Sequence, residues 1–193
     1  MHREMAEKIL MTADALMVQR GYSAFSYADI AKVVGIRKAS IHHHFPTKEG
    51  LAVAVLQAHR KKVIEGMEAL DSQIESPLER IQTYLQYWEG CIRGKTVSFC
   101  VAALMGAEMP SLPEDVQAEV RLHFNALANW LERTLEAGVK KRVIQLQGSA
   151  ATEAQTLMAV LHGSMLSARA LDDCEVFKTT TDAAVMRISA AKN

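Results

Sequence analysis

The chain has 193 residues, of which 49% are apolar and 23% charged, the balance of a globular protein with one domain or two small ones. It contains no apolar run near the roughly 18–20 residues of a membrane span, and its charged N-terminus lacks the apolar stretch of a secretion signal. Three widely spaced cysteines do not form a disulfide framework, so we expect a cytoplasmic protein.

The formal net charge of zero hides two opposed parts. Residues 1–62 hold ten Lys or Arg against five Asp or Glu, a balance of +5, and residues 63–193 hold 12 against 17, a balance of −5. A basic first third followed by an acidic remainder indicates that one end of the chain binds a polyanion.

Helical periodicity and few helix breakers predict an all-α fold, with no β-like alternation, repeat or low-complexity segment. Gly21 and Gly35 end helices, Ser26 with Asp29 resembles a capping box, and Ser76 precedes a proline at a first helical position. About nine helices are expected, over residues 3–20, 27–34, 38–44, 48–70, 77–93, 98–105, 114–137, 150–171 and 176–190.

The second and third of these helices form a helix-turn-helix pattern in the basic part of the chain. Ile30 of the first and Ile41 of the second would form the buried contact, with Phe45 one turn beyond Ile41. The opposite face of residues 38–44 then carries hydrogen-bonding side chains suited to a DNA major groove.

Three sequence segments extend this pattern: Phe-Ser-Tyr-Ala-Asp-Ile-Ala at 25–31, Val-Gly-Ile at 34–36 and Ser-Ile-His-His-His-Phe-Pro-Thr-Lys-Glu-Gly-Leu at 40–51. Together they resemble the N-terminal domain of the TetR family of bacterial transcriptional regulators. The resemblance is strong over about residues 5–55 and rests on architecture alone afterwards. It implies a helix-turn-helix DNA-binding domain over residues 1–50 and a helical ligand-binding and dimerisation domain over residues 51–193.

By this resemblance the protein is a homodimeric regulator, expected to be a repressor that leaves a palindromic double-stranded DNA operator when a small apolar or electrophilic effector binds its C-terminal domain. Ser40 and His43 are the expected base contacts, and Lys38, His44 and Lys48 are expected near the DNA backbone. The full set of expected DNA-binding residues is Tyr27, Arg37, Lys38, Ser40, His42, His43, His44 and Lys48.

Three positions depart from the family pattern. Arg37 stands where a small capping residue is usual, and we interpret it as a phosphate contact, with an exposed arginine as the alternative. His42 replaces the tyrosine that is usual at a presumed phosphate contact. Gly50 replaces a common glutamate and removes one capping interaction. None of the three is a buried position, so the expected fold is unaffected.

Catalytic and metal sites are not expected. The chain has no glycine-rich phosphate loop, Gly-x-Ser-x-Gly, His-Glu-x-x-His or Cys-x-x-Cys motif, so an enzyme is not indicated. The consecutive histidines 42–44 point about 100° apart on a helix and cannot all ligate one ion. We therefore expect no metal and no cofactor.

A single helix-turn-helix needs a two-fold partner to reach two major grooves. A stripe of small residues on helix 150–171 would allow close approach of two copies, together with the last helix, and by family resemblance these helices would form a four-helix bundle. Packing of the stripe within one protomer is the alternative. The expected interface residues are Ala159, Gly163, Ser167, Ala170, Phe177, Ala184 and Ile188.

The middle helices are rich in soft and aromatic side chains with a few polar groups, which suits an apolar ligand pocket or an ordinary helical core. The candidate pocket residues are Trp88, Cys91, Phe99, Cys100, Met105, His123, Phe124, Trp130, Met158 and His162.

Cys100 is also a candidate redox or electrophile sensor, because the region around it resembles that of TetR-type regulators that sense through a cysteine. Cys100 lies two residues after an expected N-cap at Ser98 and near Lys95, and both would lower the pKa of its thiol. Cys91 would then be its resolving partner. Burial in an apolar helix would raise the pKa instead. A chromosome-organising DNA-binding protein and a purely structural helical dimer are further alternatives.

Overall fold

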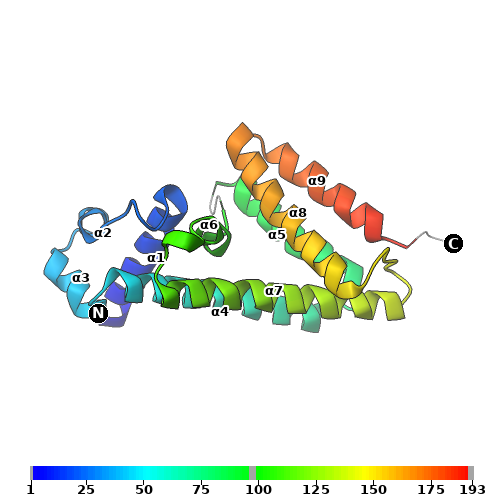
Figure 1. The fold of residues 1–193 in the computed structure, drawn as a ribbon, viewed down its shortest axis with the longest axis horizontal. Helices are drawn as coiled ribbons and strands as arrows, with labels where there is room; N and C mark the ends of the chain where they lie inside the picture. Colours follow the sequence, from blue (N-terminus) through cyan, green and yellow to red (C-terminus); the bar gives the residue numbers. More distant parts are fainter. Residues whose placement is uncertain (1, 96–98, 191–193) are drawn as a thin grey trace. The chain divides into compact units, whose positions relative to one another are not determined.

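The computed structural model describes residues 2–95 and 99–190, with side chains from residue 4 onward. Figure 1 shows the helices in chain order. Within the described residues they are α1 (His2–Arg20), α2 (Tyr27–Val34), α3 (Lys38–His44), α4 (Lys48–Gln73), α5 (Pro77–Arg93), α6 (Val101–Ala107), η1 (Met109–Ser111, a 3-10 turn), α7 (Glu114–Lys140), α8 (Ala150–Leu171) and α9 (Cys174–Ile188). Over these described residues, the prediction of an all-α fold with about nine helices is confirmed.

The chain forms two compact units, each made of two segments. Unit 1 contains residues 1–62 and 100–123, and unit 2 contains residues 63–99 and 124–193. Helices α4 and α7 therefore each contribute one part to either unit. The functional division at residues 50 and 51 stays a prediction, since unit 1 includes α6 and the first part of α7 as well as the helix-turn-helix.

In unit 1, the end of α1 is joined to the end of α6. Gly21 has φ +80° and ends α1, as predicted, and the next backbone N–H, of Tyr22, donates to Glu108 Oε1 at 3.1 Å. A Cβ atom at Gly21 would lie 2.3 Å from the same oxygen. Glycine is thus required both by the left-handed backbone and by the close approach of Glu108.

The helix-turn-helix follows from local signals. Asp29 accepts hydrogen bonds from the Ser26 backbone N–H at 2.8 Å and the Ser26 hydroxyl at 2.6 Å, at the start of α2. Gly35 ends α2 in the left-handed region, and its N–H donates to Ala31. Ile30 and Ile41 are completely buried and form the core of the motif. Phe45 is only half-buried, because α3 ends before it.

Gly35 in unit 1 and Gly66 in unit 2 provide a stability test. At Gly35, where φ is +76° and an added Cβ would meet no atom within 4 Å, alanine is expected to destabilise the protein by about 1 kcal/mol through backbone strain alone. At Gly66, within α4 and equally open, alanine is expected to stabilise it by about 0.5–1 kcal/mol. Chemical denaturation of both variants checks the pair, and equal signs would contradict the reasoning.

Unit 2 contains α5, α8, α9 and the later parts of α4 and α7. Side chains of Ser76, Ser149 and Asp173 accept backbone hydrogen bonds at the starts of α5, α8 and α9. Trp130 and Phe177 are among its largest fully buried side chains. Within the described residues, none of the helices is both long and apolar enough to cross a membrane.

Candidate functional site

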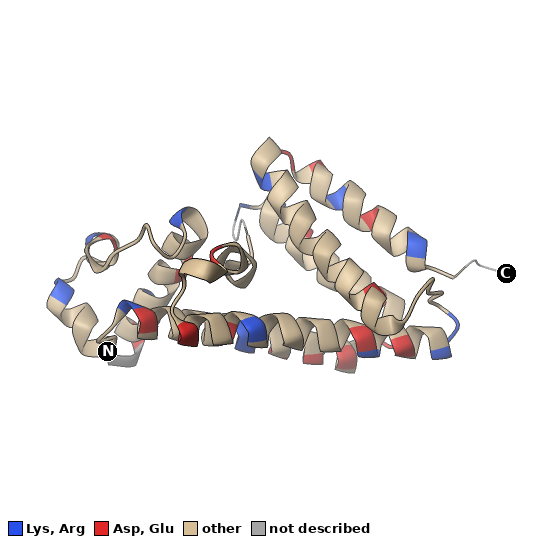
Figure 2. Ribbon diagram, in the orientation of Figure 1, with Lys and Arg blue, Asp and Glu red and all other residues tan. Residues whose placement is uncertain are grey.

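Helix α3 presents an exposed polar face in unit 1. Lys38, Ser40 and His43 are exposed, and Arg37 is an exposed N-cap residue whose side chain makes no cap hydrogen bond. His44 is half-buried. Figure 2 shows basic residues on both short helices, α2 and α3. Cationic and hydrogen-bonding side chains on one accessible helix are the components of a major-groove reader.

Two of the expected DNA-binding residues, Tyr27 and His42, make structural contacts. Tyr27 is buried, and its hydroxyl donates to the Phe45 carbonyl at 2.7 Å. Burial is the main cause that raises the pKa of Tyr27 to about 12. The His42 ring lies 4.7 Å from the Tyr27 ring, and its Nδ1 is 3.3 Å from the Pro46 carbonyl oxygen. These contacts hold the end of α3 against the start of α2.

Lys48 is partly withdrawn from solvent at the start of α4. Its Nζ lies 3.4 Å from the Ser23 carbonyl and over the rings of Phe25 and Tyr22, at 4.5 and 4.7 Å from their centroids. Burial lowers the pKa of Lys48. Lys48 therefore anchors the segment after α1, and a DNA phosphate at this position would share it with that structural contact.

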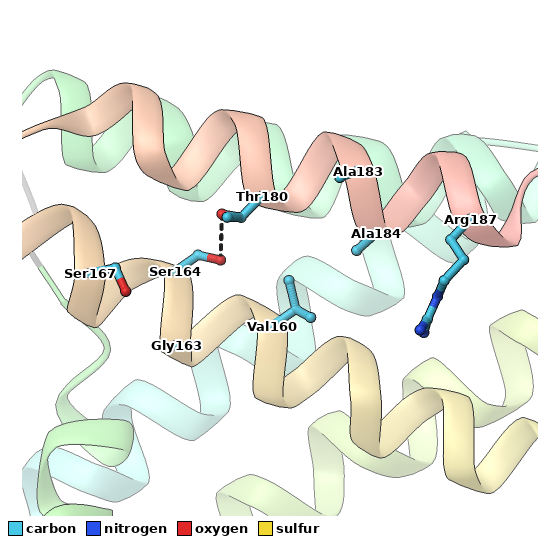
Figure 3. Close-up of a pocket in the computed structure, with 8 residues that line it drawn as sticks. All are labelled: Val160, Gly163, Ser164, Ser167, Thr180, Ala183, Ala184 and Arg187. Carbon is cyan, nitrogen blue, oxygen red and sulfur yellow. Dashed lines mark hydrogen bonds between the residues drawn. The ribbon is translucent and has the colours of Figure 1, made fainter.

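The small-residue stripe of α8 is exposed in unit 2. Ala159, Gly163, Ser167 and Ala170 all lie on the outer face of the helix. Next to the stripe, α8 and α9 border a shallow groove of about 470 Å³, shown in Figure 3 with Gly163 at its α8 edge. The Thr180 hydroxyl donates to Ser164 Oγ across this groove at 2.8 Å.

The predicted contribution of α9 needs correction. Phe177 and Ile188 are 0% and 1% exposed, so they pack inside the protomer and are not available to a second copy. Ala184 is 9% exposed and lines the groove. The apolar side chains that α8 and α9 do expose include Leu166 and Met186, at 58% and 76%. Periodicity placed both kinds of residue on apolar faces and did not distinguish the inner face from the outer one.

The ten candidate pocket residues fall into both units. Cys100, Met105 and His123 belong to unit 1, and the other seven belong to unit 2. In unit 2, the Trp130 indole N–H donates to Asp71 at 3.2 Å, and its ring contacts Tyr84. Trp130 also lines a groove of about 200 Å³.

A second aromatic contact in unit 2 joins α7 and α8. The rings of Phe124 and His162 are 5.1 Å apart between centroids. Burial lowers the pKa of His162 to about 4, so this imidazole is neutral at pH 7. His162 therefore acts as an uncharged aromatic side chain in the middle of α8.

Of the two alternatives for the Cys100 thiol, a pKa lowered by the helix start and a pKa raised by burial, the second applies. Cys100 is 2% exposed, and burial is the main cause that raises its pKa to about 12, with Asp14 also raising it. The thiol is the N-cap residue of α6, and backbone N–H groups there counter burial only in part. The expected N-cap, Ser98, lies outside the described residues, and Cys91 belongs to the other unit.

This pKa predicts slow chemistry at Cys100. At pH 7 hardly any of this thiol would be ionised, so alkylation is expected to be far slower than at the half-exposed Cys91 and Cys174. The Cys100 rate should increase about tenfold per pH unit from pH 7 to 9, because the thiolate fraction grows without levelling off below the pKa. Peptide mapping after iodoacetamide treatment in chelator-containing buffer measures all three rates, and fast neutral-pH labelling of Cys100 would contradict the expectation.

A polar cluster that the sequence analysis missed connects α4 and α7 within unit 1. Glu119, 9% exposed, accepts hydrogen bonds from Arg60 and Gln57, both at 2.9 Å. One turn further along, the rings of His59 and His123 lie 5.0 Å apart. In the sequence, the one sign of this cluster is that Glu119 and His123 lie four residues apart and so share a helix face. Their partners on α4 are about 60 residues earlier in the chain and give no such sign.

With this geometry established, comparison with known proteins gives the family. The model for bacterial regulatory proteins of the tetR family matches residues 9–55, and that for the tetracyclin repressor-like C-terminal domain matches residues 77–184. The second match alone spans more than half of the chain. The chain belongs to the TetR family.

Individual relatives agree with this assignment. A TetR-family transcriptional regulator from Agrobacterium tumefaciens has a crystal structure with a TM-score of 0.96 and 45% identity, covering 98% of this chain and 100% of that one. The HTH-type transcriptional repressor NemR of Escherichia coli K12 is 28% identical over 166 residues, 84% of this chain and 83% of NemR. The reduced form of E. coli NemR superimposes with a TM-score of 0.83 at 25% identity, covering 96% and 97% of the two chains.

Family membership fixes the class of activity. The protein is a DNA-binding transcriptional regulator, and its relatives are regulators and not enzymes, as predicted. Members of the family bind operator DNA, act as dimers and respond to small-molecule effectors.

Proposed function

We propose that this protein is a cytoplasmic homodimeric repressor that binds a palindromic operator and leaves it when a small molecule binds the helical C-terminal part. The observation that carries the proposal is the exposed polar face of α3, held on a buried helix-turn-helix core. The similarity to a named repressor, NemR, supports repression over activation.

The helix-turn-helix of each protomer is its DNA-reading head, and within it the residues have different proposed roles. Ser40 and His43, exposed on α3, read base edges, and Arg37 and Lys38 at its start contact phosphates. Tyr27, His42 and Lys48 mainly hold the head together, because each already has a contact inside unit 1. His44, half-buried, contributes at the edge of the surface.

We infer that the dimer forms through the outer faces of α8 and α9. The exposed small residues let the α8 backbones approach closely, and Leu166 and Met186 supply apolar area beside them. A two-fold arrangement is required because half-sites in successive major grooves lie about 34 Å apart. Alternation between two spacings of the heads would then connect effector binding to DNA release.

The effector site is proposed at the groove that Trp130 lines between α4 and α7 in unit 2. Apolar side chains such as Ile64 and Met67, beside polar ones such as Asp71 and Asn129, suit a small, partly apolar molecule. Sensing through Cys100 is a weaker alternative, since its pKa is raised and its thiol is buried.

Footprinting of the full-length protein on the DNA adjoining its own gene tests the function. A repressor is expected to protect one short palindrome at nanomolar concentration, with mirror-related contacts in its two halves. Protection of many scattered sites would favour a chromosome-organising role, and absence of DNA binding at low salt would leave a structural dimer. Either result would overturn the proposal.

A further inference from the structure

Three metal-ligating side chains from separate parts of the chain meet in unit 1. The Cys100 sulfur lies 3.3 Å from His59 Nε2 and 3.6 Å from His123 Nε2, and the three ligand atoms are all within 4.8 Å of one another. Cys100 and His123 are buried, and His59 is half-buried. From these positions we propose that His59, Cys100 and His123 bind a thiophilic transition-metal ion, of the Zn²⁺ or Cu⁺ class.

The spacing of the ligands fits one ion. With bonds of about 2.3 Å to sulfur and 2.0 Å to nitrogen at tetrahedral angles, a shared zinc ion would hold sulfur and nitrogen about 3.5 Å apart. The two sulfur–nitrogen distances, 3.3 and 3.6 Å, lie on either side of this value. The two imidazole nitrogens, within 4.8 Å of one another, would close to about 3.3 Å around such an ion through side-chain rotation.

The surroundings suit a cation. Binding replaces the Cys100 S–H bond by a metal–sulfur bond and releases the proton to solvent, while each imidazole supplies a lone pair. Bound Zn²⁺ with one thiolate leaves a net charge of +1, and Asp14 is close enough for its negative charge to act on Cys100. One Asp14 oxygen is buried and accepts no hydrogen bond. This carboxylate would balance the buried charge.

The two histidines are held by the fold on either side of the cysteine. Glu119 binds Arg60 and Gln57, which fixes α7 against α4 one turn from His123 and next to His59. Cys100 comes from the residue that begins α6. A bound ion would thus join three elements of unit 1, and the half-buried His59 leaves one side open for metal entry.

The sequence predicted no metal site, because only neighbouring histidines formed a visible group. His59 and His123 are 41 and 23 residues from Cys100. This site is separate from the DNA-reading face of α3 and does not depend on the proposed operator or effector. Its ligand set, one thiolate and two imidazoles, favours soft or borderline ions over Mg²⁺ or Ca²⁺.

Metal titration of the reduced, chelator-treated, full-length protein tests the proposal. One equivalent of Zn²⁺ or of Cu⁺ per chain is expected to bind in competition with a chromophoric chelator, and the tighter of the two identifies the ion. Saturating Zn²⁺ or Cu⁺, whichever binds, should raise Tm by about 5–10 °C. Co²⁺ used as a probe should give a thiolate charge-transfer band and the intense visible bands of a tetrahedral site.

Variants assign the ligands. Cys100→Ser should abolish the charge-transfer band, and His59→Gln, at a half-buried position that tolerates change, should weaken metal binding at least tenfold. Matched controls are the Cys91→Ser/Cys174→Ser double variant and His43→Gln, both of which should bind the metal with wild-type affinity. Should Cys100→Ser fail to fold, the wild-type Co²⁺ spectrum and His59→Gln decide. Failure of wild type to bind either metal, or unchanged binding in His59→Gln, would overturn the proposal and leave a hydrogen-bonded thiol–imidazole cluster.

Discussion

Replacing Gly163 with leucine is expected to lower operator affinity by about 100-fold or more, because two heads that no longer form a linked pair bind DNA separately. A Cβ atom at Gly163 would meet nothing within 4 Å in the protomer, so the monomer should accept the larger side chain. The same side chain would prevent close approach of a second α8. Sedimentation velocity and operator titration of the variant measure the two effects together.

Gly66→Leu is the matched control. Gly66 also lies on an exposed helix face with open space around it, but on α4, away from the proposed interface. It should dimerise and bind DNA as wild type. An undisturbed dimer in Gly163→Leu would move the interface elsewhere on the molecule.

The second large effect is expected from the start of α3. Removing both cations in Arg37→Ala/Lys38→Ala should weaken binding to all DNA sequences about equally. The slope of log affinity against log salt should decrease by about one per lost phosphate contact, which is about four for a dimer. Titrations at several salt concentrations, on operator and on unrelated DNA, measure this slope.

His43→Ala provides the contrast on the same helix. As a base contact it should relax preference at one or two operator positions while leaving the salt slope nearly unchanged. Because Arg37, Lys38 and His43 are all exposed, none of these variants should affect folding. A double variant with wild-type affinity and slope would show that α3 does not approach the phosphates.

The head of this protein was predictable because its signals are local. Gly35 adopts the left-handed conformation that the turn requires, Ser26 and Asp29 begin α2, and Ile30 and Ile41 are buried as their spacing predicted. Caps, turns and short helical periodicity act over a few residues, so the chain itself displays them.

Local signals in the sequence do not show which face of an apolar helix is buried by the rest of the protomer. Gly163 and Phe177 both belong to helices that carry apolar residues, yet the first is exposed and the second completely buried. Helical periodicity identifies a face, and only the packing of α8 against its neighbours decides whether that face is inside a protomer.

The sequence by itself therefore determined the helical class, the helix-turn-helix and the polar face of α3, since each depends on interactions between residues close in the chain. The tertiary structure alone decided the state of Cys100. Its place at the start of a helix favoured a lowered pKa, but burial raises it, because desolvation of a thiolate outweighs the few N–H groups at the helix end. The tertiary structure also brought His59 and His123 to the same sulfur, from positions whose separation in the chain gave no sign of it.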